Sequence, residues 1–469
     1  MAQQAERGLS RHPLATIRNH RRPLKRREAL ALPPQLTQRR HTSEGALPRG
    51  RSEDLLRQGD PWCDCPRALR HPGDRAPPVP NFCPTWRATL MAHGTHWGLA
   101  TMAQSVEGGI TAARRQALSQ GCLRAATRKA AHAILVTCHP RVPLRAVWGD
   151  GAVSSSAGQR CGLQARALLG ALSPRDLGSY DQALTVYTPS ADQHSVLHTP
   201  VIACSGREAI YVLDGLLAND TVLRPKEHFV DQHGYTDQLF GLCHLLGYSL
   251  MPRLRVNKHK LYKLDRTTHY GRLDDVLTGT VDLALIREQW DQLVRVAASL
   301  RNRTAPAHVV LKRLASSAPS DRLAKALTAL GQALKSIYLL RYVQDEPLRA
   351  RMQLQTNRGE GRHQLARRLV FAHQGALQTG DYEESMHKAS CRSLLSNAAL
   401  GWHTMHMPRI IKQRRAAGAT VTDAELARVA PLALAHIIPH GTYCTRPTPR
   451  ENPGEPNGHF SLLEMASDV

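Results

Sequence analysis

Segments whose residue pattern favours β-strands are confined to the middle of the chain, and this constrains the fold more than any other feature. In five short stretches apolar and polar residues alternate or the residues are continuously apolar, and on either side of this region the pattern is helical. Helical patterns at 208–217 and 235–246 separate some of these stretches. The expected strands lie at 146–151, 184–188, 196–204, 228–231 and 248–254. Strands and helices that alternate within one region predict an α/β or α+β domain with a mixed sheet.

After Asp282 the strand patterns stop and helix formers dominate. The expected helices lie at 285–300, 307–314, 322–343, 347–374, 391–406 and 422–430. Aromatic residues make up only 5% of the chain, so its core must be built mainly from Leu, Ala, Val and Ile. We therefore expect six regions. They are a basic tail at 1–85, a helical lead-in at 86–145, the sheet-bearing core at 146–280, a helical insertion at 281–345, C-terminal helices at 346–445 and a flexible tail at 446–469.

The first region is rich in Arg, Pro, His and Gln, and proline pairs at 33–34 and 77–78 interrupt its short helical patterns. A stretch of this composition buries little apolar surface, so we expect it to be disordered. It also contains Cys63 and Cys65, followed by His71 and Cys83. A zinc site is an alternative for these residues, although Cys-x-Cys is not the usual ligand spacing.

The charge of the chain points to a polyanionic partner. The chain of 469 residues carries 62 Lys and Arg against 38 Asp and Glu, which gives a formal net charge of +24. Such a protein is attracted to nucleic acid, and its affinity should fall with salt. A GC-rich genome that inflates Arg is the alternative explanation. We find no apolar run long enough for a membrane span and no signal-peptide core, so we expect a cytoplasmic, nucleoid-associated bacterial protein without a membrane partner.

Three stretches carry an extended resemblance to one family. They lie at 148–160, 227–237 and 357–367, and shorter matches at 187–194, 212–217 and 252–255 support them. In order and spacing these segments resemble the catalytic segments of transposases of the Tn3 family, from about residue 90 to about residue 443. Members of the family are typically longer. The resemblance therefore implies that the N-terminal domains that recognise DNA ends are missing from this chain.

The resemblance implies an RNase H-like fold with an Asp-Asp-Glu triad, Mg²⁺ or Mn²⁺ as cofactor, and no organic cofactor. Two hard cations held by carboxylates can activate the attacking oxygen and stabilise the leaving oxygen in phosphoryl transfer. By this match Asp231, at the end of an expected strand, is the second acid. Glu360, expected to open a helical run, is the third acid. Both are the expected catalytic and metal-binding residues.

The first acid departs from the family pattern. The family motif is Ser-Ser-Asp-Gly-Gln-Arg, and in this chain Ala157 stands where the Asp is expected. A methyl group cannot bind a metal ion, so activity should be impaired or lost. Asp150 is the candidate substitute, although an odd separation along an extended chain points it away from the direction of Ala157.

Several basic residues near these motifs are candidates for DNA contact. Guanidinium groups suit bidentate contact with phosphate, and the alternative for such residues is a solvated charged helix face. The candidates are Arg160, His228, Arg358, Arg362 and Arg367.

The first functional interpretation is a Tn3-family DNA transposase that cleaves transposon ends and transfers the strands in replicative transposition, impaired by the loss of the first Asp. Its partners would be inverted-repeat ends and target DNA, with a homodimer on DNA as a further expectation. A second interpretation is a non-catalytic DNA-binding remnant that inhibits an intact transposase, or is the product of a decayed gene. A third is a basic nucleic-acid-binding protein with no connection to a transposon.

Overall fold

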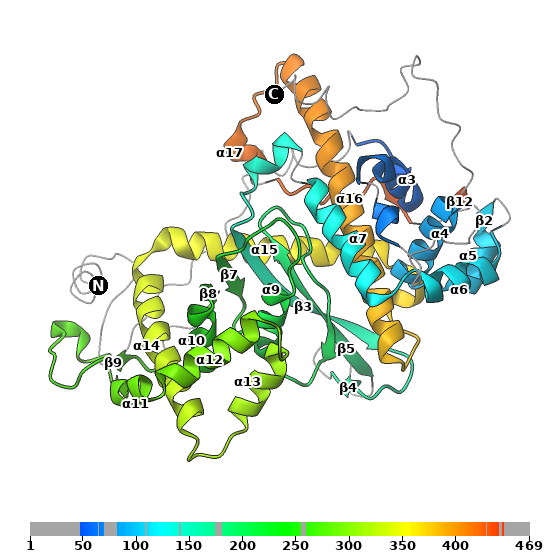
Figure 1. Ribbon diagram of the computed structural model, residues 1–469. Helices are drawn as coiled ribbons and strands as arrows, with labels where there is room; N and C mark the ends of the chain where they lie inside the picture. The colour runs from blue at the N-terminus through cyan, green and yellow to red at the C-terminus, as the bar shows by residue number, and fades with distance from the viewer. Residues whose placement is uncertain are drawn as a thin grey trace.

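The structure, a computed structural model, describes residues 47–63, 65–69, 82–107, 110–139, 142–173, 181–254, 259–427, 429–439 and 443–444. Its chain begins with helices that pack together, passes through a six-stranded sheet, and ends in long helices (Figure 1). The early helices are α3 (Ser52–Cys63), α4 (Phe82–Gly94), α5 (Leu99–Ser105), α6 (Ala112–Gly121) and α7 (Ala125–Cys138).

The sheet has the strand order β4-β5-β3-β7-β8, and β6 pairs with β5. Strand β3 pairs antiparallel with β5 and parallel with β7, which pairs parallel with β8. A mixed sheet of this kind agrees with the α/β, RNase H-like expectation. The bounds are β3 Val153–Leu163, β4 Ala171–Leu172, β5 Gln182–Ala191, β6 Val201–Ala203, β7 Glu227–Val230 and β8 Ser249–Pro252.

The helices after the sheet form two groups. Insertion helices α11 (Leu283–Glu288) and α12 (Trp290–Arg301) pack against α14, and α13 (Ala307–Ala315) packs against α9 and α10. They lie on the other side of the sheet from the early helices (Figure 1). Helix α16 instead packs against α3, α4 and α7. The remaining helices are α9 (Val212–Leu217), α10 (Asp237–Leu245), α14 (Arg322–Gln344), α15 (Glu346–Leu369), α16 (Tyr382–Ala416) and α17 (Asp423–Leu426).

Two large hydrophobic cores stabilise these groups. One joins Phe229 and Leu250 of the sheet to Leu242 of α10 and Leu327 of α14. The other joins the early helices to α16, and its members include the fully buried Trp86 and Leu394. Aliphatic residues dominate both, as the low aromatic content predicts. None of the described helices is long and apolar enough to cross a membrane.

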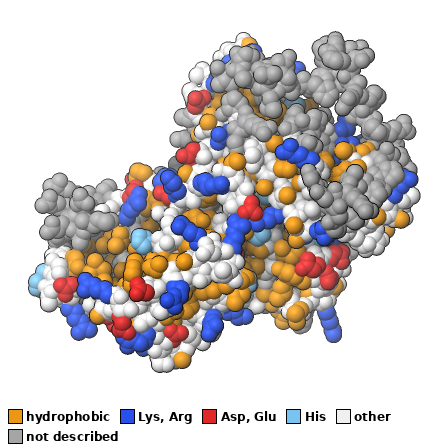
Figure 2. Space-filling model, in the orientation of Figure 1, with side chains coloured by type: hydrophobic (Ala, Val, Ile, Leu, Met, Phe, Trp, Pro, Cys, Tyr) orange, Lys and Arg blue, Asp and Glu red, His pale blue; other side chains and the backbone are white. Residues whose placement is uncertain are grey.

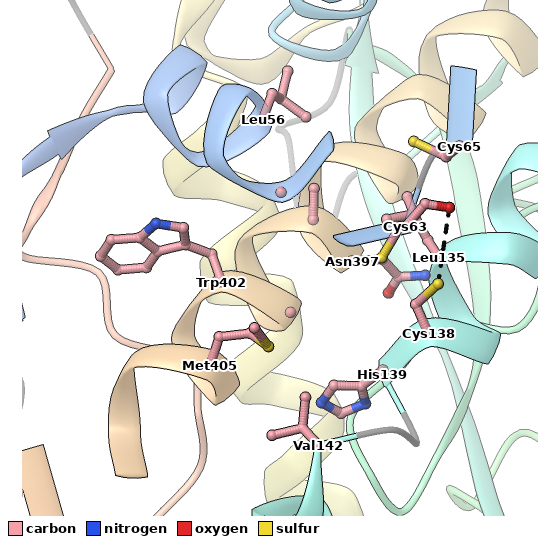
Figure 3. Close-up of a pocket in the computed structure, with 13 residues that line it drawn as sticks. Leu56, Cys63, Cys65, Leu135, Cys138, His139, Val142, Asn397, Trp402 and Met405 are labelled. Atoms are coloured by element: carbon pink, nitrogen blue, oxygen red, sulfur yellow. Dashed lines mark hydrogen bonds between the residues drawn. The ribbon is translucent and has the colours of Figure 1, made fainter. Parts of the chain in front are cut away.

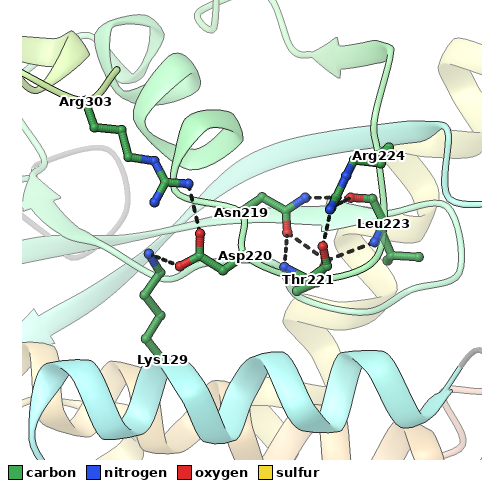
Figure 4. Close-up of polar contacts among 7 residues, drawn as sticks. All are labelled: Lys129, Asn219, Asp220, Thr221, Leu223, Arg224 and Arg303. Carbon is green, nitrogen blue, oxygen red and sulfur yellow. Dashed lines mark hydrogen bonds and ion pairs between the residues drawn. The ribbon is translucent and has the colours of Figure 1, made fainter. Parts of the chain in front are cut away.

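An ionic junction ties the early helices to the insertion. The carboxylate of Asp220 lies 2.5 Å from Lys129 Nζ of α7 and 2.8 Å from Arg303 Nη2, which follows α12 (Figure 4). The side chains of Asn219 and Thr221 hold the Asp220 turn, because Asn219 Oδ1 accepts hydrogen bonds from both the backbone and the hydroxyl of Thr221. All three charged groups are partly exposed, so each pair contributes up to about 1 kcal/mol.

Four local expectations differ from the structure. Residues 52–63, inside the region expected to be disordered, form α3, because Leu55 and Leu56 are buried in the second core. The expected strand at 146–151 is a 3-10 helix, Pro143–Val147, followed by a turn. The turn forms because Gly149 and Gly151 adopt positive φ. Within 196–204 only β6 is a strand, and short two-residue strands such as β11 (Ile437–Ile438) occur after residue 282.

The other expected elements are present. The strand expected at 228–231 is β7, the strand expected at 248–254 is β8, and the helix expected at 235–246 is α10. The helices expected between 285 and 406 occur as α11 to α16, although α15 ends at Leu369 and α16 is much longer than the expected stretch 391–406. Of the helix expected at 422–430, only α17 (Asp423–Leu426) is present. The regional boundaries remain a prediction.

Candidate active site

Ala157 and Asp231 lie in the same region of the sheet. Ser155 of β3 and Phe229 of β7 are the last residues that these parallel strands pair, and Ala157 and Asp231 each follow two residues further along. Glu208, which hydrogen-bonds to the Gly158 backbone, feels the charge of Asp231. Neighbouring strands are about 4.8 Å apart. Asp231 follows directly after β7 and is exposed. Its Oδ1 accepts a hydrogen bond of 2.9 Å from the backbone N–H of His233, which orients the carboxylate.

Helix α15 crosses β7 and β3 and brings Glu360 to the same face. Arg351, near its start, forms an ion pair with Glu227 and lies over the Phe229 ring at 5.6 Å. Further along, the His363 ring hydrogen-bonds to the backbone of Ala157. A Cβ placed on Gly359 would lie 4.0 Å from Ala157 Cβ. Gly359 therefore packs over Ala157, and the side chain of Glu360, the next residue, is exposed.

The sequence led us to expect Glu360 at the start of a helix. It lies instead in the middle of α15 (Glu346–Leu369). Asp345 caps the start of the helix, since its side chain accepts a hydrogen bond from the Leu348 N–H, and Pro347 lies in the first turn. Glycines at 359 and 361 do not interrupt it. The helix persists because Leu348, Met352 and Leu365 are buried on its inner side.

The donor set at this face is incomplete for a metal ion. Asp231 and Glu360 carry carboxylates, but the side chain at position 157 is a methyl group. Within the part of the chain that the structure describes, no three His, Cys, Asp or Glu residues are placed to share a metal ion. Mg²⁺ needs hard oxygen ligands in octahedral geometry. These residues therefore do not form a complete two-metal site.

Asp150 does not replace the missing acid. It lies in the turn before β3, where its Oδ1 accepts a 2.9 Å hydrogen bond from the Ala152 N–H. The five residue steps from Ala152 to Ala157 span about 16 Å at about 3.3 Å per step. Asp150 lies instead near Asp192, whose pKa rises to about 6 through burial despite the attraction of Arg358. Our suggestion that Asp150 substitutes is therefore wrong.

Glu208 is an acid of this region that the sequence did not single out. Its carboxylate approaches Gly158 so closely that a side chain there would collide with it, and it hydrogen-bonds to the Gly158 backbone. Burial, and then the negative charge of Asp231, raise the pKa of Glu208 to about 7, while Arg160 opposes the rise. No spacing rule indicated Glu208, because it begins a short 3-10 helix and lies outside the three segments that carry the family resemblance.

Arg358 and Arg362 are not part of an exposed phosphate-binding face, contrary to our prediction. Their side chains are 8% and 5% exposed. Arg358 donates hydrogen bonds to the carbonyl oxygens of Asp192 at 2.9 Å and Trp148 at 3.1 Å, so it fixes α15 to the loops beside β3 and β5. The prediction failed because these residues lie on the side of α15 that packs against the sheet.

His228 is also buried, with 0% of its surface exposed. Its ring nitrogens lie 2.8 Å from the hydroxyl oxygens of Ser154 and Ser156, which cross-link β7 to β3. Burial lowers the pKa of His228 to about 3, so the ring is neutral. The predicted DNA contact of His228 is therefore wrong. Arg160 and Arg367 are exposed, and their contact with DNA remains a prediction.

Cys63 and Cys65 border a pocket between α3, α7 and α16 (Figure 3). Cys138 Sγ donates to the carbonyl oxygen of Cys63 at 3.9 Å, and His139 and Trp402 line the same pocket. Cys83 is exposed on α4, and His71 lies outside the described residues. The described residues contain no metal-binding group here, so the zinc alternative gains no support.

A mixed sheet with an acid at the end of a parallel strand, and a second acid on a helix that crosses it, defines an RNase H-like, DDE-type core. The family model "Tn3 transposase DDE domain" matches residues 54–443, and the chain belongs to this family. This excludes the interpretation as a nucleic-acid-binding protein unrelated to transposons.

The curated relatives that the chain resembles are also transposases. The transposase for transposon Tn1546 of Enterococcus faecium is 33% identical over 398 residues, which cover 85% of this chain and 40% of the relative. The Escherichia coli transposases for Tn21 and for gamma-delta are 33% and 31% identical, over 87% and 88% of this chain and 41% of each relative. The chain thus spans about two fifths of the length of these relatives.

Proposed function

We propose that this chain binds DNA as the catalytic region of a Tn3-type transposase, and that its end cleavage and strand transfer are impaired. The observation that carries the proposal is the methyl group of Ala157, on the strand position where the family motif has an acid. Loss of a residue that supports a metal ligand typically costs about 10–100-fold in metal affinity or activity, and loss of a ligand itself should cost more.

The chain's own residues supply orientation and charge at this face. The His233 N–H holds the Asp231 carboxylate, and α15 holds Glu360 over β3. These two carboxylates are what remains to bind Mg²⁺ or Mn²⁺, whose role would be to polarise phosphate oxygens. Arg160 and Arg367 are exposed on the same two elements, and we propose that they contact the DNA backbone.

The net charge supports DNA as the partner. Lys and Arg side chains are spread over the face shown in Figure 2, including the hollow between its two lobes. The matched relatives are named as transposases for transposons, which supports inverted-repeat ends and target DNA as the ligands. A homodimer on DNA and a place at the bacterial nucleoid in the cytoplasm complete this proposal.

A second candidate function is inhibition of an intact transposase. The observation that favours it is the missing carboxylate at position 157. A chain that occupies DNA or an intact partner without cleaving would act as a dominant inhibitor. A decayed gene product with neither activity is the remaining alternative.

A strand-transfer assay on repeat-end DNA, in Mg²⁺ and in Mn²⁺, tests the proposal. We expect DNA binding with little or no strand transfer by the chain itself, and a marked gain in Ala157→Asp. The double variant Ala157→Asp, Asp231→Asn should lose the gain. Equal activity of the chain and Ala157→Asp would show that residue 157 is not the first acid position. Added to an intact relative's reaction, the chain should lower strand transfer if it is an inhibitor.

A further inference from the structure

The pocket between α3, α7 and α16 brings two thiols together. Cys63 is the last residue of α3, and Cys138 is the last residue of α7. Both line the pocket, and their side chains point toward the same part of it (Figure 3). Cys138 Sγ donates a hydrogen bond of 3.9 Å to the carbonyl oxygen of Cys63. Two cysteines that are 75 residues apart in the chain therefore meet at one cavity.

The contact between Cys138 Sγ and Cys63 favours a disulfide bond between the two residues. The carbonyl oxygen and Sγ of Cys63 are each two bonds from the same Cα, so a sulfur atom close to this oxygen is also close to the Cys63 side chain. Rotation about the Cα–Cβ bonds changes the distance between the two sulfur atoms without moving either helix. A disulfide needs Cα atoms no more than about 7 Å apart, and the direct packing of α7 on α3 allows this.

A small oxidant can reach the pair. Cys63 and Cys138 are partly exposed, whereas Cys65, which lines the same pocket, is buried. The pocket encloses about 40 Å³ that water-sized molecules can enter, which is room for at least one molecule of water or of hydrogen peroxide. Cys243 and Cys391 differ, because both are fully buried and burial raises the pKa of their thiols. The thiolate is the reactive form of cysteine, so oxidation should favour the accessible pair over these two.

We propose that Cys63 and Cys138 form a site of oxidative modification, at which hydrogen peroxide converts the two thiols into a disulfide that ties α3 to α7. The sulfur of one thiolate attacks a peroxide oxygen and the O–O bond breaks. The departing hydroxide takes up a proton and leaves as water, and the attacking sulfur becomes a sulfenic acid. The second sulfur then attacks the first, so that the S–S bond forms, the S–O bond breaks and a second water leaves. The two sulfur atoms lose two electrons, which reduce the peroxide to two waters.

The disulfide would join helices that are otherwise connected through α16. Helices α3 and α7 each pack against α16, and Trp402 Nε1 of α16 donates a hydrogen bond of 2.6 Å to Gln58 Oε1 of α3. In the reduced chain the atoms that line the pocket lack contacts across it. A bond across the pocket fixes the end of α3 to α7 and restricts the unfolded chain. Oxidation should therefore stabilise the early helices, and this effect does not depend on DNA binding or on the metal site.

The first test treats the full chain with hydrogen peroxide, blocks the remaining thiols with N-ethylmaleimide and maps the peptides by mass spectrometry without reduction. We expect a linked pair of peptides that contain Cys63 and Cys138, lighter by two hydrogen atoms than the separate peptides and separated again by dithiothreitol. Cys63 and Cys65 share the tryptic peptide 58–67, so Cys65→Ser is the matched control and should keep the link. Cys63→Ser and Cys138→Ser should each lose it.

Three results would overturn the proposal. Cys63 and Cys138 could both keep their thiols under conditions that oxidise the exposed Cys83. The link to Cys138 could persist in Cys63→Ser, which would assign it to Cys65. Its yield could rise with protein concentration, which would show that it joins two chains. The mapping is made on the parent chain as well, so it decides the proposal even where a variant does not fold.

The second test asks whether the bond ties the two helices. The Tm of the oxidised chain should exceed that of the reduced chain by about 5 °C, and dithiothreitol should reverse the rise. Cys65→Ser should show the same rise, whereas Cys138→Ser should have the same Tm before and after treatment with peroxide. Equal Tm values for the linked and the reduced parent chain would contradict a disulfide that stabilises the early helices.

Discussion

Ala157 on β3 and Asp231 after β7 each lie two residues beyond Ser155 and Phe229, the last residues that these parallel strands pair. Asp231 keeps its carboxylate, whereas the methyl group of Ala157 cannot bind a metal ion. Helix α15 completes the arrangement, since Gly359 lies over Ala157 and Glu360 follows it. The consequences can be tested one residue at a time.

Gly158 should not tolerate a side chain. An added methyl group would meet the Glu208 carboxylate and lie 2.7 Å from Thr185 Cγ2, so Gly158→Ala should lower the free energy of unfolding by about 1–3 kcal/mol. Gly401→Ala in α16 is the matched control, because nothing lies within 4 Å of its added methyl. It should stabilise the helix by about 0.5–1 kcal/mol. Urea denaturation measures both, and equal effects of the two variants would contradict the close approach of Glu208.

Arg358 and Arg367 should differ in what they support, although both lie on α15. Arg358→Met leaves the carbonyl oxygens of Asp192 and Trp148 without their donor, and should cost about 2–4 kcal/mol of stability. Arg367→Met should change stability by less than about 0.5 kcal/mol. Arg367→Met should instead make the slope of log K for DNA binding against log salt concentration shallower by about one. The reverse pattern in denaturation and DNA-binding titrations would show that the burial of Arg358 is wrong.

Stability should fall as the pH drops below about 6.5, the ordinary pKa of a histidine side chain. The pKa of His228 in the folded chain is lowered to about 3 by burial. Between these values the unfolded chain binds a proton that the folded chain does not, so the stabilisation present at neutral pH is lost toward pH 3. In His228→Gln the slope of unfolding free energy against pH should be smaller by about 1.4 kcal/mol per pH unit in this window. The exposed His233→Gln is the control, and an unchanged slope in His228→Gln would argue against a buried neutral ring.

The sequence predicted well the elements whose local pattern agrees with their tertiary environment. The stretch 228–231 has an apolar strand core ending in an acid, and it forms β7 with Asp231 directly after it. The long helices after Asp282 contain strong helix formers with buried Leu on one side, so propensity and packing agree.

The failures arise where tertiary contacts decide. Trp148 and its neighbours have a strand-like composition, but the left-handed glycines at 149 and 151 turn the chain. The Arg residues of α15 resemble a solvated face until the crossing of the helix over β3 buries Arg358 and Arg362. Glu208 reaches Asp231 only through the fold, so no local pattern could indicate it.

The incomplete metal site is tested most directly by calorimetric titration of the chain with Mn²⁺, compared with Ala157→Asp. We expect weak binding by the chain, and binding at least about tenfold tighter by Ala157→Asp. This gain should disappear when Asp231→Asn is added to Ala157→Asp. Equal Mn²⁺ affinity of the chain and Ala157→Asp would contradict the conclusion that the carboxylate missing at position 157 leaves the metal site incomplete.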